Sequence, residues 1–260
     1  MLFILLAHAA GVLLFCKGFL LKRIEIHERS QCHPPDQSSA LHLHESFASG
    51  PTNTHGCSVY PARFKRVIWL LIDAFRYDFA VYDSSLDPSP PHYRNKLPVI
   101  RDLLQEHPQH AKLFRFFADP PTTTLQRLKA LTTGGLPTFV EVSSNFNSPE
   151  VLEDSLLYQI HSQGLNSTIL GDNTWTGLYE KLLTNVFSYP SFNVKDLYTV
   201  DNAIIARLVP QLKMKDASFV VAHFLGVDHC GHTLGPSHPA MADKLTQMDQ
   251  ILRYYWIHCL

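Results

Sequence analysis

Carboxylate and imidazole side chains gather near the C-terminal end of the sequence, directly after an apolar run. Residues 217–225 are almost wholly apolar and predict a buried strand, and Asp228, His229 and His232 follow it in a loop broken by glycines. Asp228 and His232 are four residues apart, so they share a face if the segment forms a helical turn. Carboxylate and imidazole at the end of a strand suit a divalent metal. A polar loop with a capping Asp228 and a surface His232 is the alternative interpretation.

A second acid and a run of hydroxyls follow other predicted elements. Asp73 ends the apolar run 66–73, where it could cap a helix or bind a metal, and Asp is a favoured capping residue. Thr122, Thr123 and Thr124 stand at the start of a predicted helix, which one of their hydroxyls could cap. Alternatively, a hydroxyl at a helix N-terminus could act as a nucleophile. The free amides there can hold a phosphate, and a metal would lower the pKa of the hydroxyl.

The elements that position these residues alternate between strands and helices. Apolar runs predict strands, and apolar residues at helical spacing predict helices. The predicted strands are 66–73, 111–118, 167–170 and 217–225, and the predicted helices are 97–107, 124–133, 149–163, 197–212 and one from about Pro239. This alternation is typical of an α/β fold with a mostly parallel sheet flanked by helices. Open sheets of this kind place their chemistry at the carboxyl ends of the strands.

The composition is that of a globular protein with a substantial core. The chain has 260 residues, of which 45% are hydrophobic, and its formal net charge is −1. This charge gives no basic footprint for nucleic acid, so no nucleic-acid partner is predicted. The five cysteines show no Cys-x-x-Cys spacing, and no cysteine zinc site is predicted either.

The N-terminal part of the chain differs from the rest. Leu2 to Leu21 is almost wholly apolar, and about 20 apolar residues are enough to span a bilayer as a helix. Residues 1–22 therefore predict a retained transmembrane anchor. A cleaved signal peptide and a buried core helix are the alternative interpretations. Residues 23–62 are rich in Pro, Ser, His and Gly and predict a linker or a lumenal wrap. Residues 63–260 are then the domain that carries the candidate site.

The residues alone leave the side of the membrane open. Lys17, Lys22 and Arg23 follow the apolar run and favour a cytoplasmic domain by the positive-inside rule. Against this, Asn166 lies in an Asn-Ser-Thr glycosylation sequon, which matters only in a secretory lumen.

Four motifs in a fixed order are similar to a known family. They are Leu-Ile-Asp-Ala-Phe-Arg-Tyr-Asp at 71–78, Pro-Thr-Thr-Thr-Leu-Gln-Arg at 121–127 with Thr-Gly at 133–134, Gly-Asp-Asn-Thr-Trp at 171–175, and Gly-Val-Asp-His-Cys-Gly-His-Thr-Leu-Gly-Pro at 226–236. Together they resemble the lumenal catalytic domain of the GPI ethanolamine phosphate transferases, within the alkaline phosphatase superfamily. Residues 190–196 and 225–231 are most similar to the type that acts on the third mannose. The resemblance covers essentially residues 1–250.

The resemblance implies an activity, a location and partners. The activity is transfer of phosphoethanolamine from phosphatidylethanolamine to a mannose of the GPI glycolipid precursor, at a site with two zinc ions. The location is the endoplasmic reticulum membrane with the catalytic domain in the lumen, which would decide the orientation in favour of the sequon at Asn166. A small multi-span membrane subunit is a further implied partner.

The resemblance also implies roles for individual residues. Asp73 matches a ligand of the metal that activates the nucleophile. Thr124 matches the nucleophile, which also contacts that metal, because it lies ten residues before Gly134 as the family's nucleophile lies before its Thr-Gly or Ala-Gly. Thr123 is the alternative. Asp228 and His232 match two ligands of the other metal.

The sequence ends before the remaining metal ligands of the family. The family completes its metals with an Asp-His-Gly motif on a later strand and a further His, and this motif does not follow before Leu260. The resemblance therefore implies a chain truncated at its C-terminus, without the later membrane spans. Two hypotheses follow from it. The chain is a metal-dependent phosphoethanolamine transferase, or it is a non-catalytic fragment that associates with the partner subunit of its relatives.

Overall fold

The computed structural model describes residues 1–19, 26, 28–30, 64–85, 92–137, 150–214 and 216–259. The predicted linker over residues 23–62 lies almost wholly outside these residues. At the N-terminus, α1 (Leu2–Phe19) is a helix whose side chains are nearly all exposed. Within the described part of the chain, no helix is both long enough and apolar enough to cross a membrane. The predicted transmembrane anchor is therefore not confirmed.

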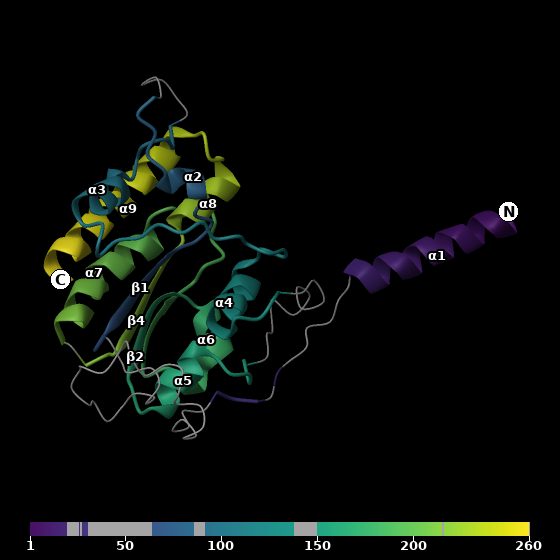
Figure 1. The fold of residues 1–260 in the computed structure, drawn as a ribbon, viewed down its shortest axis with the longest axis horizontal. Helices are drawn as coiled ribbons and strands as arrows, with labels where there is room; N and C mark the ends of the chain where they lie inside the picture. Colours follow the sequence, from purple (N-terminus) through teal and green to yellow (C-terminus); the bar gives the residue numbers. More distant parts are fainter. Residues whose placement is uncertain are drawn as a thin grey trace, which may run out of the picture.

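A parallel four-stranded sheet forms the centre of the fold (Figure 1). Its strands are β1 (Val67–Ile72), β2 (Ser167–Asp172), β3 (Asn185–Tyr189) and β4 (Phe219–Phe224), in the order β1-β4-β2-β3. All three neighbouring pairs are parallel. This confirms the predicted α/β class. Because β4 lies between β1 and β2, it is buried on both faces, as its almost wholly apolar run predicts.

One predicted strand does not form, and one strand was not predicted. No regular element forms over residues 111–118, where the aromatic rings of Phe114, Phe116 and Phe117 are exposed. Their spacing imitates a strand, but within the described residues no neighbouring strand pairs with them. Conversely, β3 was missed. It is a short edge strand with polar residues and only partial burial, so it lacks the apolar run that marks the inner strands.

Helices cover both faces of the sheet (Figure 1). One face packs on α7 (Thr199–Met214) and α9 (Pro239–Cys259), with α3 (Pro98–Glu106) beside α9. The other face packs on α4 (Thr124–Thr133), α5 (Leu156–Ser162) and α6 (Thr174–Tyr179). Alternate residues of β4 supply the two cores. Val220, Ala222 and Phe224 contribute to the first, and Phe219 and Val221 to the second.

The predicted helices form with small changes at their ends, except that one is much shorter than predicted. The prediction over 149–163 gives only α5, because Ser155 caps the helix by accepting the Tyr158 amide. The predicted loop after β4 is instead a helix, α8 (Gly226–Thr233). Three short segments were not predicted: α2 (Tyr77–Ala80), α6 and the 3-10 turn η3 (Glu180–Leu182).

Candidate active site

Asp73 and Thr124 come together at the carboxyl end of β1. Asp73 directly follows that strand, and Thr124 is the first residue of α4. The Thr124 hydroxyl donates a hydrogen bond to Oδ2 of Asp73 over 3.0 Å, and the Ala74 amide donates to Oδ1 over 2.8 Å. Asp73 is not the cap of the next helix, because α2 begins four residues later with Arg76 in the capping position. The capping interpretation of Asp73 is therefore wrong.

The start of α4 separates the roles of the neighbouring threonines. Thr123 occupies the N-cap position, yet its side chain makes no capping bond. Its hydroxyl is buried and has no hydrogen-bond partner among the described residues. Thr124 is thus the hydroxyl that contacts the acid. The first amides of α4 have no partner within the helix and carry its positive end, so they are suited to an anion.

A buried histidine supports Asp73 from β4. His223 is 2% exposed, and its Nε2 lies 3.4 Å from Oδ2 of Asp73. The indole Nε1 of Trp175 donates to Nδ1 of His223 over 3.2 Å. An indole N–H can only donate, so Nδ1 accepts and the ring proton sits on Nε2, facing Asp73. His223 is the buried histidine that its position in the apolar run predicts, but its contact with the candidate nucleophile's acid was missed.

A glycine beside His223 and the hydrogen bonds to Asp73 maintain the contact between these two residues. A Cβ at Gly171 would lie 2.6 Å from the carbonyl oxygen of His223, so only glycine allows β2 this close to β4. Burial acts to raise the pKa of Asp73, but hydrogen bonds from His223, Thr124 and the Ala74 amide outweigh it and hold that pKa below its ordinary value. Asp73 is therefore an anion in the folded chain.

Asp228 and His232 lie on α8, which follows β4 directly. Because the segment is helical, the two side chains share a face as predicted, with Nε2 of His232 3.4 Å from Oδ1 of Asp228. Burial raises the pKa of Asp228, and the nearby Asp73 carboxylate raises it further. The two acids therefore lie close enough to repel each other. The side chain of His232 is 66% exposed.

His229 lies beside Asp228 but serves a different purpose. Its Nδ1 is 2.8 Å from the carbonyl oxygen of Asp196, and its Nε2 is 3.0 Å from that of Ser191. Both ring nitrogens are thus occupied by backbone groups. With these contacts in place, the ring of His229 is not free to join Asp228 and His232 at a metal.

A buried ion pair holds the start of α8. The carboxylate of Asp201, on α7, accepts the amides of Leu225 and Gly226 over 2.9 and 3.1 Å. Its Oδ2 lies 2.6 Å from Nζ of Lys244, on α9, and both side chains are at most 1% exposed. A Cβ at Gly226 would lie 2.1 to 2.4 Å from atoms of this pair. This pair was not predicted from the sequence. The pattern that could have indicated it is a charged residue on the apolar face of each of two helices, Asp201 on α7 and Lys244 on α9.

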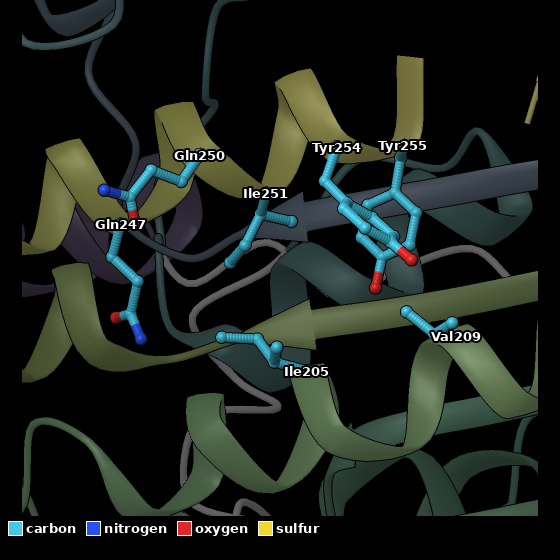
Figure 2. Close-up of a pocket in the computed structure, with 7 residues that line it drawn as sticks. All are labelled: Ile205, Val209, Gln247, Gln250, Ile251, Tyr254 and Tyr255. Carbon is cyan, nitrogen blue, oxygen red and sulfur yellow. The ribbon is translucent and has the colours of Figure 1, made fainter. Parts of the chain in front are cut away.

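Thr124, Asp228 and His232 line a cavity of about 380 Å³, and Asp73 reaches it through its hydrogen bond with Thr124. Its walls come from the start of α4, the ends of β2 and β4, the loop after β3, and α8: Thr122, Thr123, Thr124, Leu125, Asp172, Thr174, Ser191, Phe192, Val194, Leu225, Asp228, His229 and His232. A second pocket, of about 280 Å³, lies between α7 and α9. Figure 2 shows that aliphatic side chains, two tyrosines and two glutamines line it. It lacks carboxylates and imidazoles, so the first cavity is the candidate site.

The donors suit zinc in kind but fall short in number. Asp73 with Thr124, and Asp228 with His232, offer the oxygen and nitrogen atoms that zinc takes, and the two nearby carboxylates present negative charge that a cation would neutralise. A catalytic zinc usually has about three protein ligands. Among the residues that the structure describes, no group of three or more His, Cys, Asp or Glu side chains is placed to hold a metal.

The glycosylation sequon lies away from the cavity. Asn166 is exposed and precedes β2, whereas the candidate residues follow the carboxyl ends of the strands. Its side-chain amide donates to the carbonyl oxygen of Asp216 over 3.3 Å. Glycosylation of Asn166 stays a prediction.

Comparison with known proteins agrees with the motifs. No family model matches the chain. GPI ethanolamine phosphate transferase 3, catalytic subunit, of Homo sapiens is 45% identical over 248 residues, which are 94% of this chain and 22% of that protein. GPI ethanolamine phosphate transferase 3 of Schizosaccharomyces pombe is 40% identical over 253 residues, which are 96% of this chain and 26% of that protein.

A type 2 relative matches more weakly. GPI ethanolamine phosphate transferase 2, catalytic subunit, of Homo sapiens is 34% identical over 247 residues, which are 93% of this chain and 22% of that protein. The chain thus spans between a fifth and about a quarter of the length of these curated relatives. Over the region that matches them, it belongs to the family of the GPI ethanolamine phosphate transferases.

Proposed function

We propose that this chain carries the nucleophile of a transferase that moves phosphoethanolamine from phosphatidylethanolamine to a mannose, the third, of the GPI precursor. One observation carries the proposal. The Thr124 hydroxyl, at the N-terminus of α4, is hydrogen-bonded to the Asp73 carboxylate and lines a cavity that also holds Asp228 and His232. The names of the relatives support the reaction, and similarity to the type 3 proteins supports the choice of mannose.

Thr124 acts in two displacements at phosphorus. Its Oγ1 attacks the phosphate of phosphatidylethanolamine, the bond from phosphorus to the diacylglycerol oxygen breaks, and the hydroxyl proton ends on the released diacylglycerol. A mannose hydroxyl then attacks the phosphothreonine, and Thr124 recovers a proton as the new phosphodiester leaves. Asp73, held by His223, accepts the hydrogen bond of Thr124 and so orients Oγ1 toward the cavity. The free amides of α4 are suited to the phosphate oxygens.

We propose zinc as the cofactor, with Asp73 and Thr124 at one ion and Asp228 and His232 at another. When bound, zinc would lower the pKa of the nucleophilic hydroxyl and neutralise charge at the phosphate. The support is the donor chemistry of these four side chains and the closeness of the two acids.

We also propose a membrane setting for the reaction. The apolar run over residues 1–22 would anchor the chain in the endoplasmic reticulum membrane, with the catalytic domain and Asn166 in the lumen. The phosphatidylethanolamine donor is itself a membrane lipid, which favours an anchored enzyme. A multi-span partner subunit belongs to the same proposal.

Product analysis tests the reaction. Membranes that contain the chain are supplied with labelled phosphatidylethanolamine and a GPI precursor, and the glycan is examined by mass spectrometry. We expect one phosphoethanolamine on the third mannose with the wild-type chain and with Thr123→Ala, and none with Thr124→Ala. Free phosphoethanolamine without a modified glycan would show hydrolysis in place of transfer, and an active Thr124→Ala variant would exclude this nucleophile.

A second candidate function is that of a non-catalytic chain that folds and associates with a partner. The observation in its favour is that the donors gather only in pairs among the described residues. Zinc content separates the two candidates, since binding depends on how many ligands the folded chain supplies. Two tightly bound zinc ions per purified chain would exclude the non-catalytic candidate. A chain without zinc, whose product assay is also unaffected by Thr124→Ala, would exclude the enzyme.

A further inference from the structure

An unpaired carboxylate lines the candidate cavity from the carboxyl end of β2. Asp172 is 2% exposed, and its Oδ1 accepts both the amide and the hydroxyl of Thr174, each over 2.8 Å. For Oδ2, no hydrogen-bond or ion-pair partner exists among the residues that the structure describes. One oxygen of a buried carboxylate therefore lacks a partner at the wall of the cavity.

Among the described residues, Asp172 differs from the other buried carboxylates in lacking a cationic partner. Asp172, Asp201 and Asp249 are the buried carboxylates of the described chain. Asp201 pairs with Lys244 over 2.6 Å, and Asp249 pairs with Arg253 over 3.1 Å. Burying a carboxylate is costly unless it is paired and hydrogen-bonded. The two acids that support the fold obey this rule, whereas Asp172 has only half of its oxygens satisfied.

A cation that enters the cavity would supply the contact that Oδ2 of Asp172 lacks among the described residues. No lysine or arginine lines the cavity, so none competes for the carboxylate. A metal ion would need about three protein ligands, and Asp172 belongs to no such group among the described residues. An ammonium group differs in that one carboxylate oxygen and a few polar neighbours can hold it.

We propose that Asp172 binds the ammonium of the phosphoethanolamine that Thr124 transfers. This assignment rests on the proposed function, because it places the ammonium and the reacting phosphate of one headgroup in the same cavity. The cavity of about 380 Å³ is large enough for that headgroup. Phe192 and Val194 offer apolar surface for its ethylene carbons. Asp172 then determines specificity for an aminoethyl phosphate and leaves the chemical step to Thr124.

Titration calorimetry with two small ligands tests the subsite. O-phosphoethanolamine and ethyl phosphate share the phosphate and differ in the ammonium. We expect the whole wild-type chain to bind phosphoethanolamine about tenfold more tightly, because a hydrogen bond between charged groups contributes on this scale. Asp172→Asn keeps an acceptor for Thr174 and removes the charge, so the ratio should fall to about one. Asp119→Asn removes an exposed charge outside the cavity and should keep the wild-type ratio.

The possible failures are distinct. Equal binding of the two ligands by the wild-type chain contradicts the ammonium subsite but leaves phosphate binding, and with it the proposed function, intact. If Asp172→Asn keeps the wild-type preference for phosphoethanolamine over ethyl phosphate, another group binds the ammonium and the assignment to Asp172 is wrong. Absence of binding for both ligands contradicts the subsite and the proposed function together. The wild-type ratio decides the first point even if Asp172→Asn does not fold.

Discussion

Replacing Lys244 by methionine should destabilise the chain strongly. Nζ of Lys244 contacts three oxygens, those of Asp201, the Leu197 carbonyl and Gln247, over 2.6 to 2.7 Å, with the lysine side chain 0% exposed. The substitution leaves the Asp201 carboxylate buried and without its cationic partner. Removing one partner of such a pair costs about 3 to 5 kcal/mol of unfolding free energy. With a urea m-value of about 2 kcal/mol/M, the midpoint should fall by about 1.5 to 2.5 M.

The double variant separates the lost ion pair from lost packing. In Asp201→Asn with Lys244→Met, neither charge of this pair remains, and the asparagine oxygen can still accept the Leu225 and Gly226 amides. We therefore expect the double variant to lose less stability than Lys244→Met alone, so the two effects are strongly non-additive. Urea unfolding of the whole chain, followed by circular dichroism, gives all the midpoints.

A surface pair provides the matched control. Lys181 forms an ion pair with Glu150, but its side chain is 77% exposed. Lys181→Met should lower the urea midpoint far less than Lys244→Met does, because water screens and solvates the remaining charge. If Lys244→Met costs less than about 1 kcal/mol, the buried pair does not hold the β4–α8 junction in the way argued from its burial.

Three further predictions concern the surroundings of the site. Gly171→Ala should lower the unfolding free energy by about 1 to 3 kcal/mol, because its φ is 145° and the new Cβ would meet the His223 carbonyl. Gly177→Ala, where nothing lies within 4 Å in the middle of α6, should not destabilise, and equal effects in urea would refute the steric argument. In nitrogen-15 NMR at fixed pH, Nδ1 of His223 should be the unprotonated nitrogen in the wild-type chain, and Trp175→Phe should mix the tautomers; a protonated Nδ1 in the wild type would contradict the assigned hydrogen bond. His232→Ala should change stability by less than about 0.5 kcal/mol because the side chain is largely exposed, yet weaken zinc binding measured with a chelating dye; unchanged zinc affinity would remove His232 from the ligand set.

The inner elements of the fold could be predicted because burial leaves a mark in the sequence. The strands β1 and β4 are apolar runs, whereas β2 has only the apolar pair Ile169 and Leu170 at its centre. The helices α4, α7 and α9 have apolar residues at helical spacing. The edge strand β3 has no apolar run. The phenylalanines at 114, 116 and 117 have the spacing of a strand, although no strand forms there. Neighbouring strands decide whether such segments pair, and local sequence does not record them.

The site was only partly predictable for a similar reason. Asp73, Thr124, Asp228 and His232 follow elements whose ends are visible in the sequence, and the structure brings Asp73 to Thr124 across 51 residues. The support of these residues comes from polar groups within apolar segments. For example, Trp175 and His223 are 48 residues apart, and their contact depends on the packing of α6 against β4. Only the assembled sheet shows which of these polar groups meet.

The most direct test of the central claim is to find the covalent intermediate. The whole chain, supplied with zinc, is incubated with phosphatidylethanolamine carrying a labelled headgroup, quenched in acid and digested for tandem mass spectrometry. We predict phosphoethanolamine on Thr124, absent in Thr124→Ala and retained in Thr123→Ala. A label on Thr123, or a chain that modifies the GPI precursor while Thr124 is replaced by alanine, would contradict the account.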